Sequence, residues 1–159
     1  GSGVAVTHVT VGRVVDKGIR DANNMGAAMA PAAYATLAAH FADTGRSPED
    51  YDLILTGDLG ALGRDIVLDF FSRDGITLPN YQDCGLLLFD RARQDVHCGA
   101  SGCGCSAAVL TASLIPGLLS GRWRRVLFCP TGALLSPTST QQGESIPGVA
   151  HAIALEGGM

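Results

Sequence analysis

Hydrophobic and polar positions along the chain alternate between the spacing of strands and the spacing of helices. Residues 4–15, VAVTHVTVGRVV, alternate β-branched side chains with small or polar ones, which predicts a strand. The alanine-rich segment 23–45 has a capping residue at Asn24 and stops at Gly45, which predicts a helix. Pro31 lies inside this segment, so either the helix starts there or its first turns are irregular.

The rest of the chain continues the alternation. The pattern predicts one helical turn at Ser47–Pro48, a buried strand at 52–56, an amphipathic helix within 59–75 with Leu62, Ile66, Val67 and Phe70 on one face, an extended segment at 83–90, a strand at 124–130, a loop at 131–148 and a last strand at 149–156. Strands that alternate with helices predict an α/β fold with a largely parallel or mixed sheet. We expect a single domain over residues 1–159.

The segment 101–119, SGCGCSAAVLTASLIPGLL, carries no charged residue on any face. A helix that is apolar all round is buried all round. In a single sheet with helices on its outer faces, each helix shows one side to water. We therefore expect this helix to lie in a central layer between two sheets.

Composition narrows the class of protein. The chain has 159 residues, of which 47% are hydrophobic and 16% charged, with a net charge of −4 and a single lysine, Lys17. No basic stripe is present, which argues against a nucleic-acid partner. Five clustered cysteines, an odd number, do not form a secreted disulfide framework and favour a reduced, intracellular setting. No transmembrane segment is predicted, because the longest charge-free stretch, 96–121, is rich in Gly, Ser and Cys.

The run HCGASGCGCSAA, residues 97–108, is the segment richest in candidate chemistry. Cys98, Cys103 and Cys105 give a C-x4-C-x-C spacing, unlike the C-x2-4-C pairs of structural zinc, so neither a metal site nor a cofactor is predicted. Cys103 lies near a helix start with His97 nearby, as a nucleophilic thiol would. Cysteine also behaves as a small hydrophobic residue. Both interpretations stay open at this point, and His40 is interpreted only as a partial cation at a helix C-terminus.

Several motifs carry a resemblance to a known family. The segments MGAAMAPAA, DLILTGDLG, DCGLLLFDR, GASGCGCSA and CPTGALLSPTSTQQGESIPGVAHAIALE closely resemble the C-terminal half of the stage V sporulation protein AD family, thiolase-fold proteins of endospore formers. The wider thiolase and ketoacyl-synthase superfamily folds as two similar βαβαβαββ halves, with one buried helix from each half in a central layer. The resemblance thus implies a thiolase-like half with a mixed sheet and a buried central helix. A half leaves one face of that helix unpaired, which predicts a homodimer, pairing with the N-terminal half, or an aggregation-prone surface.

The resemblance also implies a function. The family is regarded as binding dipicolinic acid, a pyridine dicarboxylate stored in spores with calcium, so the implied ligand is this acid alone or as its calcium chelate. The implied partners are the other components of a membrane-associated complex that moves the ligand during sporulation and germination. The implied location is the spore or forespore, peripheral to the inner spore membrane.

The same resemblance argues against catalysis. Active thiolases carry a nucleophilic cysteine in their N-terminal half, a G-H-P-x-G-A-S-G-type run and a C-x-G-G-G-type loop. Here His97 stands one residue too close to Gly99 and no proline follows it, while Cys129 is kept with only one glycine after it. Gly57-Asp58 stands where such enzymes place Asn-Glu or a histidine. A non-catalytic binding protein is expected, and the alternatives are an acyltransferase that acts with the N-terminal half or a structural scaffold of a membrane complex.

Two surfaces are predicted to hold the ligand. The start of the charge-free helix, Ser101-Gly102-Cys103, would offer unpaired backbone N–H groups and a positive dipole end to a carboxylate. The loop 131–136 would face it with hydroxyls, amides and leucines, unless TGALLSP is merely a tight turn into the last strand. The predicted ligand-binding residues are Asp58, His97, Ser101, Gly102, Cys103, Thr131, Gly132, Ala133, Leu134 and Ser136.

Overall fold

A five-stranded mixed sheet forms the centre of the molecule in the computed structural model, which describes residues 3–100 and 102–158. Its order is β1-β7-β4-β2-β3, with β1 Val4–Thr10, β2 Leu53–Thr56, β3 Tyr81–Asp83, β4 Arg125–Cys129 and β7 Ala152–Gly157. Strand β2 is parallel to both β3 and β4, whereas β7 is antiparallel to β4 and β1. The carboxyl ends of β2, β3 and β4 therefore lie along one edge of the sheet, here called the carboxyl edge.

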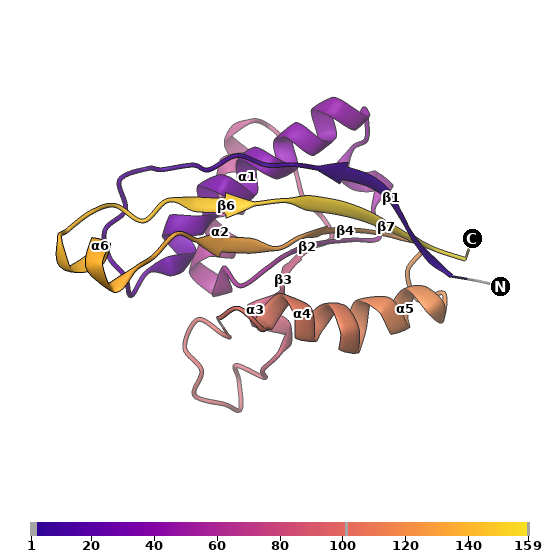
Figure 1. Ribbon diagram of the computed structural model, residues 1–159. Coiled ribbons are helices and arrows are strands. Elements are labelled where there is room, and N and C mark those ends of the chain that lie inside the picture. Colours follow the sequence, from indigo (N-terminus) through magenta and orange to yellow (C-terminus); the bar gives the residue numbers. More distant parts are fainter. Residues whose placement is uncertain (1–2, 101, 159) are drawn as a thin grey trace.

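Helices cover both faces of this sheet (Figure 1). On one face lie α1 (Met25–Thr44) and α2 (Gly60–Arg73), and on the other lies a continuous helical segment formed by α4 (Cys105–Val109), a π-helical turn (Leu110–Leu114) and α5 (Ile115–Leu119). Side chains of the central strands alternate between the two faces: Ile54 and Leu127 pack on the α1–α2 side, and Leu55, Val126 and Phe128 pack on the α4–α5 side. The period of two along each buried strand thus builds two apolar cores.

The main elements follow the order βαβαβαββ along the chain, as the resemblance to the thiolase fold implied. The predicted α/β class and mixed sheet are confirmed. The predicted turn at Ser47–Pro48 is a 3-10 helix, η1 (Pro48–Asp50). The caps predicted for α1 are also confirmed, since the Asn24 side chain accepts a hydrogen bond from the backbone N–H of Ala27 and Gly45 adopts a left-handed conformation. Pro31 lies inside the helix and does not start it.

One predicted strand is shorter in the structure, and two predicted segments contain elements that were not predicted. The strand predicted over 4–15 ends at Thr10, because the chain leaves β7 and Val15 instead pairs with Gly148 in β6 (Gly148–Ala150). The segment predicted as extended over 83–90 begins with a short helix, α3 (Cys84–Leu87), capped by the Asp83 side chain. The segment predicted as a loop over 131–148 forms β5 (Thr131–Ala133), paired with β6, with α6 (Pro137–Gln141) between them.

Helix α2 turns part of its predicted apolar face to the core: Val67 is buried and Ile66 packs against the core, as predicted, but Leu62 does not. Gly63, Val67 and Phe71 are buried, whereas Leu62 is 45% exposed. A Cβ atom built on Gly63 would lie 2.8 Å from the Cα of Gly26 in α1, so the two helices are in close contact at this pair of glycines. The close approach fixes which side of α2 faces α1.

The helical segment 105–119 is buried on one side only. Cys105, Val109, Leu114 and Leu118 pack against the sheet. The opposite side is open to solvent, and we call it the charge-free face; it comprises Ala107, Ala108, Thr111, Ala112, Pro116 and Leu119. The prediction of burial on all sides is wrong for this chain by itself, because the described residues supply a single large sheet and thus cover one side of the helix. None of the described helices is long and apolar enough to cross a membrane.

Candidate functional site

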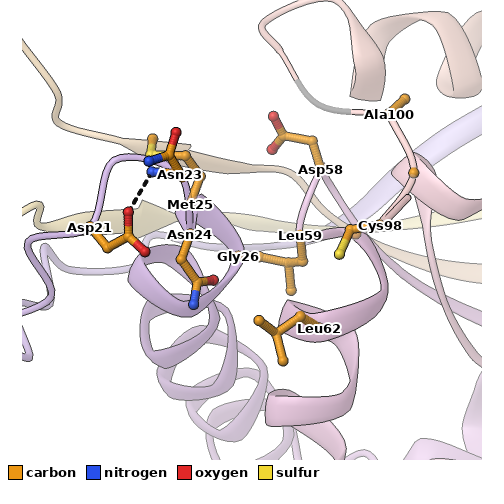
Figure 2. Close-up of a pocket in the computed structure, with 12 residues that line it drawn as sticks. Asp21, Asn23, Asn24, Met25, Gly26, Asp58, Leu59, Leu62, Cys98 and Ala100 are labelled. Atoms are coloured by element: carbon orange, nitrogen blue, oxygen red, sulfur yellow. Dashed lines mark hydrogen bonds between the residues drawn. The ribbon is translucent and has the colours of Figure 1, made fainter. Parts of the chain in front are cut away.

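A pocket of about 410 Å³ opens at the carboxyl edge of the sheet (Figure 2). Three segments form its walls: residues 21–26, which lead into α1; residues 58–62, which join β2 to α2; and residues 98–100, which precede α4. Small-molecule sites in proteins typically enclose roughly 300–1,000 Å³. The pocket is therefore large enough for a compact organic ligand.

Oxygen atoms supply much of the polar character of this pocket. Asp21 and Asp58 lie on opposite sides of it in Figure 2. The Asp21 Oδ1 atom accepts a hydrogen bond of 2.9 Å from the backbone N–H of Asn23, which leaves its second oxygen without a hydrogen bond among the described residues. The Asn24 Oδ1 atom caps α1 through the N–H of Ala27 at 3.2 Å. Carboxylate and amide oxygens of this kind are ligands for hard cations such as calcium.

Asp58 connects three segments that are far apart in sequence. Its Oδ1 atom accepts a hydrogen bond of 3.1 Å from the Thr131 hydroxyl, and its Oδ2 atom accepts one of 2.9 Å from the backbone N–H of Gly102. The Asp58 N–H in turn donates to the Thr131 Oγ1 atom at 3.4 Å. The structure thus brings together three of the predicted ligand-binding residues, Asp58, Gly102 and Thr131.

The start of the charge-free helix differs from the predicted anion site. The helix begins at Cys105, so Gly102 precedes it, and the Gly102 N–H already donates to a carboxylate of the protein itself. Cys103 is exposed. Ser101 lies outside the described residues.

The loop 131–136 was predicted to face this helix start along its length, and only Thr131 does so. Gly132 and Ala133 pair with β6, and the backbone N–H of Leu134 donates to the carbonyl of Pro147 at 2.8 Å. Leu134 is 52% exposed, and the Ser136 hydroxyl caps α6. Figure 1 shows that this hairpin carries its far end away from α4. The predicted leucine surface for a pyridine ring is therefore absent, and so is the tight turn that was its alternative.

His97 also lies apart from the pocket. It belongs to the long connection between α3 and α4, its side chain is exposed, and its Nε2 atom lies 3.6 Å from Asp95. Its carbonyl accepts a hydrogen bond from the Arg91 side chain. Among the described residues, no hydrogen bond joins the His97 imidazole to a cysteine, and its nearest charged group is Asp95.

Three buried thiols lie near the carboxyl edge, and all three hold their protons. Burial, with smaller contributions from Asp58 and Asp83, raises the pKa of Cys105 to about 11. Burial raises the pKa of Cys129 to about 12 and also raises the pKa of Cys84. Because the thiolate is the reactive form of cysteine, none of these groups is an activated nucleophile at neutral pH.

Asp83, at the end of β3, is a polar residue of this region that the sequence pattern did not reveal. It is completely buried, and its carboxylate accepts four hydrogen bonds, from the Thr56 hydroxyl at 2.7 Å and from the backbone N–H groups of Leu59, Gly60 and Gly85 at 3.1, 2.9 and 2.9 Å. Burial raises the pKa of Asp83, and these four hydrogen bonds act in the opposite direction. The only sequence signal is an aspartate before Cys84-Gly85, at the cap of a helix that was predicted as extended.

Among the described residues, no group of three or more His, Cys, Asp or Glu side chains is arranged to hold a metal ion.

Comparisons with known proteins extend this picture. Residues 1–156 match the family model described as Stage V sporulation protein AD. The chain is 47% identical over 154 residues to Stage V sporulation protein AD of Bacillus subtilis (strain 168), an alignment that covers 96% of this chain and 45% of that protein. A solved structure, 3-oxoacyl-[acyl-carrier-protein] synthase III from Aquifex aeolicus VF5, is similar with a TM-score of 0.48 and 13% identity, over 98% of this chain and 54% of that one. The chain thus spans about half the length of the curated relative it matches.

Proposed function

The chain belongs to the stage V sporulation protein AD family, and from this premise we propose that it is a non-catalytic component of the spore's dipicolinic acid uptake and release complex, which binds this acid as its calcium chelate. The site of binding is the pocket at the carboxyl edge. The protein works in the spore or forespore, peripheral to the inner spore membrane, with the other components of that complex as partners.

The pair of carboxylates on opposite sides of the pocket is the observation that carries this proposal. Dipicolinate is a planar dianion, and Asp21 and Asp58 would repel the free acid. In the calcium chelate the charge of the acid is neutralised, and the ligand's two carboxylates and ring nitrogen fill only part of a coordination shell that takes six to eight donors. Asp21 and Asp58, on opposite sides of the pocket, supply oxygens for the remaining positions. The absence of a three-residue metal site in the described residues accords with a cation that arrives already chelated.

The buried thiols of this half are not activated as nucleophiles, which accords with a non-catalytic role. Acyl transfer by a thiolase-like mechanism requires a thiolate, and the raised pKa values of Cys105 and Cys129 favour the thiol instead. The imidazole of His97 contacts Asp95 and not a cysteine. Neither an activated nucleophile nor a positioned base is therefore available among these groups.

Calorimetric titration tests the proposal. Calcium dipicolinate, free dipicolinate and calcium chloride are titrated separately into the wild-type chain and into Asp21→Asn and Asp58→Asn variants. We expect the chelate to bind most tightly and each variant to lose about tenfold or more in affinity, since a charge-assisted contact contributes roughly 1.5–3 kcal/mol.

The control is Asp69→Asn, because Asp69 is an exposed carboxylate on α2 that pairs with Arg73, away from the pocket. Equal affinity in Asp21→Asn and Asp69→Asn would place the ligand elsewhere. If none of the three solutions binds or raises the melting temperature, the ligand-binding proposal fails and a scaffold role is favoured.

The charge-free face supports a second part of the proposal, which concerns assembly. Its exposed residues are small or apolar and lie side by side on one helical segment. Contiguous exposed apolar surface of this kind marks protein contacts. We propose that this face pairs with a second copy of the chain or with the N-terminal half of the family's fold.

A further inference from the structure

Asp83 contacts one wall of the pocket directly and is connected to a second wall through Gly85. On one side its carboxylate accepts hydrogen bonds from the N–H groups of Leu59 and Gly60, which belong to the wall at residues 58–62. On the other side its Oδ1 atom accepts a hydrogen bond from the N–H of Gly85, in α3. A single side chain thus joins the turn that starts α2 to the turn that starts α3.

Gly85 in turn contacts the wall at residues 98–100. Its carbonyl accepts a hydrogen bond of 2.8 Å from the N–H of Ala100, and a Cβ atom at position 85 would lie 2.3 Å from the Ala100 carbonyl oxygen. The same wall is tied directly to α2, because the N–H of Ala61 donates to the Cys98 carbonyl at 2.8 Å. The walls at 58–62 and 98–100 are therefore fixed relative to each other through Asp83 and Gly85 on one route and through Ala61 on the other.

Two side chains orient the Asp83 carboxylate. The Thr56 hydroxyl donates its single proton to Asp83 Oδ2, so the Tyr81 hydroxyl, 2.9 Å from Thr56 Oγ1, must be the donor in that second contact. All three residues are buried. With four donors on two oxygens, an ionised carboxylate is the form that satisfies every contact, since it only accepts hydrogen bonds.

We propose that Asp83 is a positioning residue for the pocket: its buried carboxylate sets the spacing of the 58–62 and 98–100 walls, and hence the fit of the ligand, without touching the ligand itself. The proposal rests on the proposed function where it concerns the ligand, and on the contacts above where it concerns the walls.

The test compares two carboxylates that both accept hydrogen bonds from backbone N–H groups. Asp83→Asn keeps the shape of the side chain but turns an amide N–H₂ toward backbone donors. Asp52→Asn is the control, because the Asp52 Oδ2 atom accepts hydrogen bonds from the N–H groups of Arg124 and Arg125 at the opposite end of the sheet. Thr56→Val and Thr56→Ser supply milder changes, in which only serine keeps the hydroxyl that holds Asp83.

The first readout is the rate at which two completely buried thiols react with a thiol reagent, resolved by mass spectrometry. Cys84 follows Asp83 directly, whereas Cys129 lies in β4. Loss of a buried hydrogen-bond acceptor in Asp83→Asn should raise the Cys84 rate about tenfold relative to the Cys129 rate. The ratio should stay at the wild-type value in Asp52→Asn and Thr56→Ser and rise in Thr56→Val. An unchanged ratio in both Asp83→Asn and Thr56→Val would overturn the proposal, and Thr56→Val decides alone if Asp83→Asn does not fold.

The second readout is titration with calcium dipicolinate. We expect weaker binding in Asp83→Asn and Thr56→Val and wild-type affinity in Asp52→Asn and Thr56→Ser. Equal affinity in all four variants, with binding intact in the wild type, would overturn a role in ligand fit. If the wild type itself binds no chelate, the proposed function fails, and the thiol ratio still decides whether Asp83 holds the walls.

Discussion

His40 lies completely inside the molecule, although it occupies the last turns of α1. Its Nδ1 atom is 2.8 Å from the Thr10 hydroxyl, and its Nε2 atom is 2.6 Å from the Tyr51 hydroxyl. Burial, together with the nearby charges of His8 and Arg46, lowers its pKa from 6.5 to about 4, and Asp43 acts weakly in the opposite direction. The imidazole is therefore neutral in the folded protein, and its interpretation as a partial cation at the helix end is wrong.

This burial predicts a pH dependence of stability. The unfolded chain takes up a proton on His40 near pH 6.5, whereas the folded chain does so only near pH 4. Stability should thus fall as the pH falls through that window, by about 2 kcal/mol between roughly pH 7.5 and pH 5. Urea unfolding at both pH values measures it. His40→Gln should be less stable at the higher pH and show a flatter profile, and an equal slope in both proteins would assign the effect to other groups.

Sequence reasoning at this scale recovers what neighbours along the chain decide. Asn24 and Gly45 are visible as caps because a helix end is closed by residues within one turn of it. Most partners of His40 and Asp83 come from strands and turns elsewhere in the chain. Thr10, for example, lies 30 residues before His40. No local pattern therefore marks these contacts. Asp58, Gly102 and Thr131 were predicted at one site because each follows or precedes an element that ends at the same edge.

The crossing of α1 and α2 shows how elements position the pocket. Gly26 and Gly63 meet there, and a Cβ atom on Gly26 would lie 2.4 Å from the Leu59 carbonyl oxygen. Gly26 and Leu59 both line the pocket, so the close packing of the two helices also sets the width of the pocket between these two residues. The hydrophobic pattern of α2 predicted Leu62 in the core because it contains no information about this glycine contact.

Gly26→Ala should therefore destabilise the fold. The added methyl group must push apart two backbones, which costs about 1–3 kcal/mol in a well-packed interior. Gly104→Ala is the matched control, since Gly104 has a φ of −90° and no atom within 4 Å of its ideal Cβ position. Urea unfolding of both variants measures the difference, and equal stability would show that α1 and α2 can separate at no cost.

At the scale of the whole molecule, the sequence predicted a layered fold and its order of elements but not where each layer ends. The charge-free helix predicted apolar surroundings on both of its sides, and the described residues supply them on one side only. The hairpin of β5 and β6 was missed because its strands are only three residues each. Short elements whose partners are distant in sequence carry too few positions for a periodic signal.

The uncovered side of the helix makes a prediction about the isolated chain. An apolar, uncharged surface associates in water because pairing removes it from solvent. Ala112→Glu places a charge in the middle of the charge-free face at an exposed position, so it should shift sedimentation toward the monomer with little effect on unfolding. Ala42→Glu adds the same charge at an exposed position of α1, on the opposite side of the sheet, and should leave the association unchanged. A wild-type chain that stays monomeric at high concentration, or an equal effect of both substitutions, would show that this face is not where the molecule pairs.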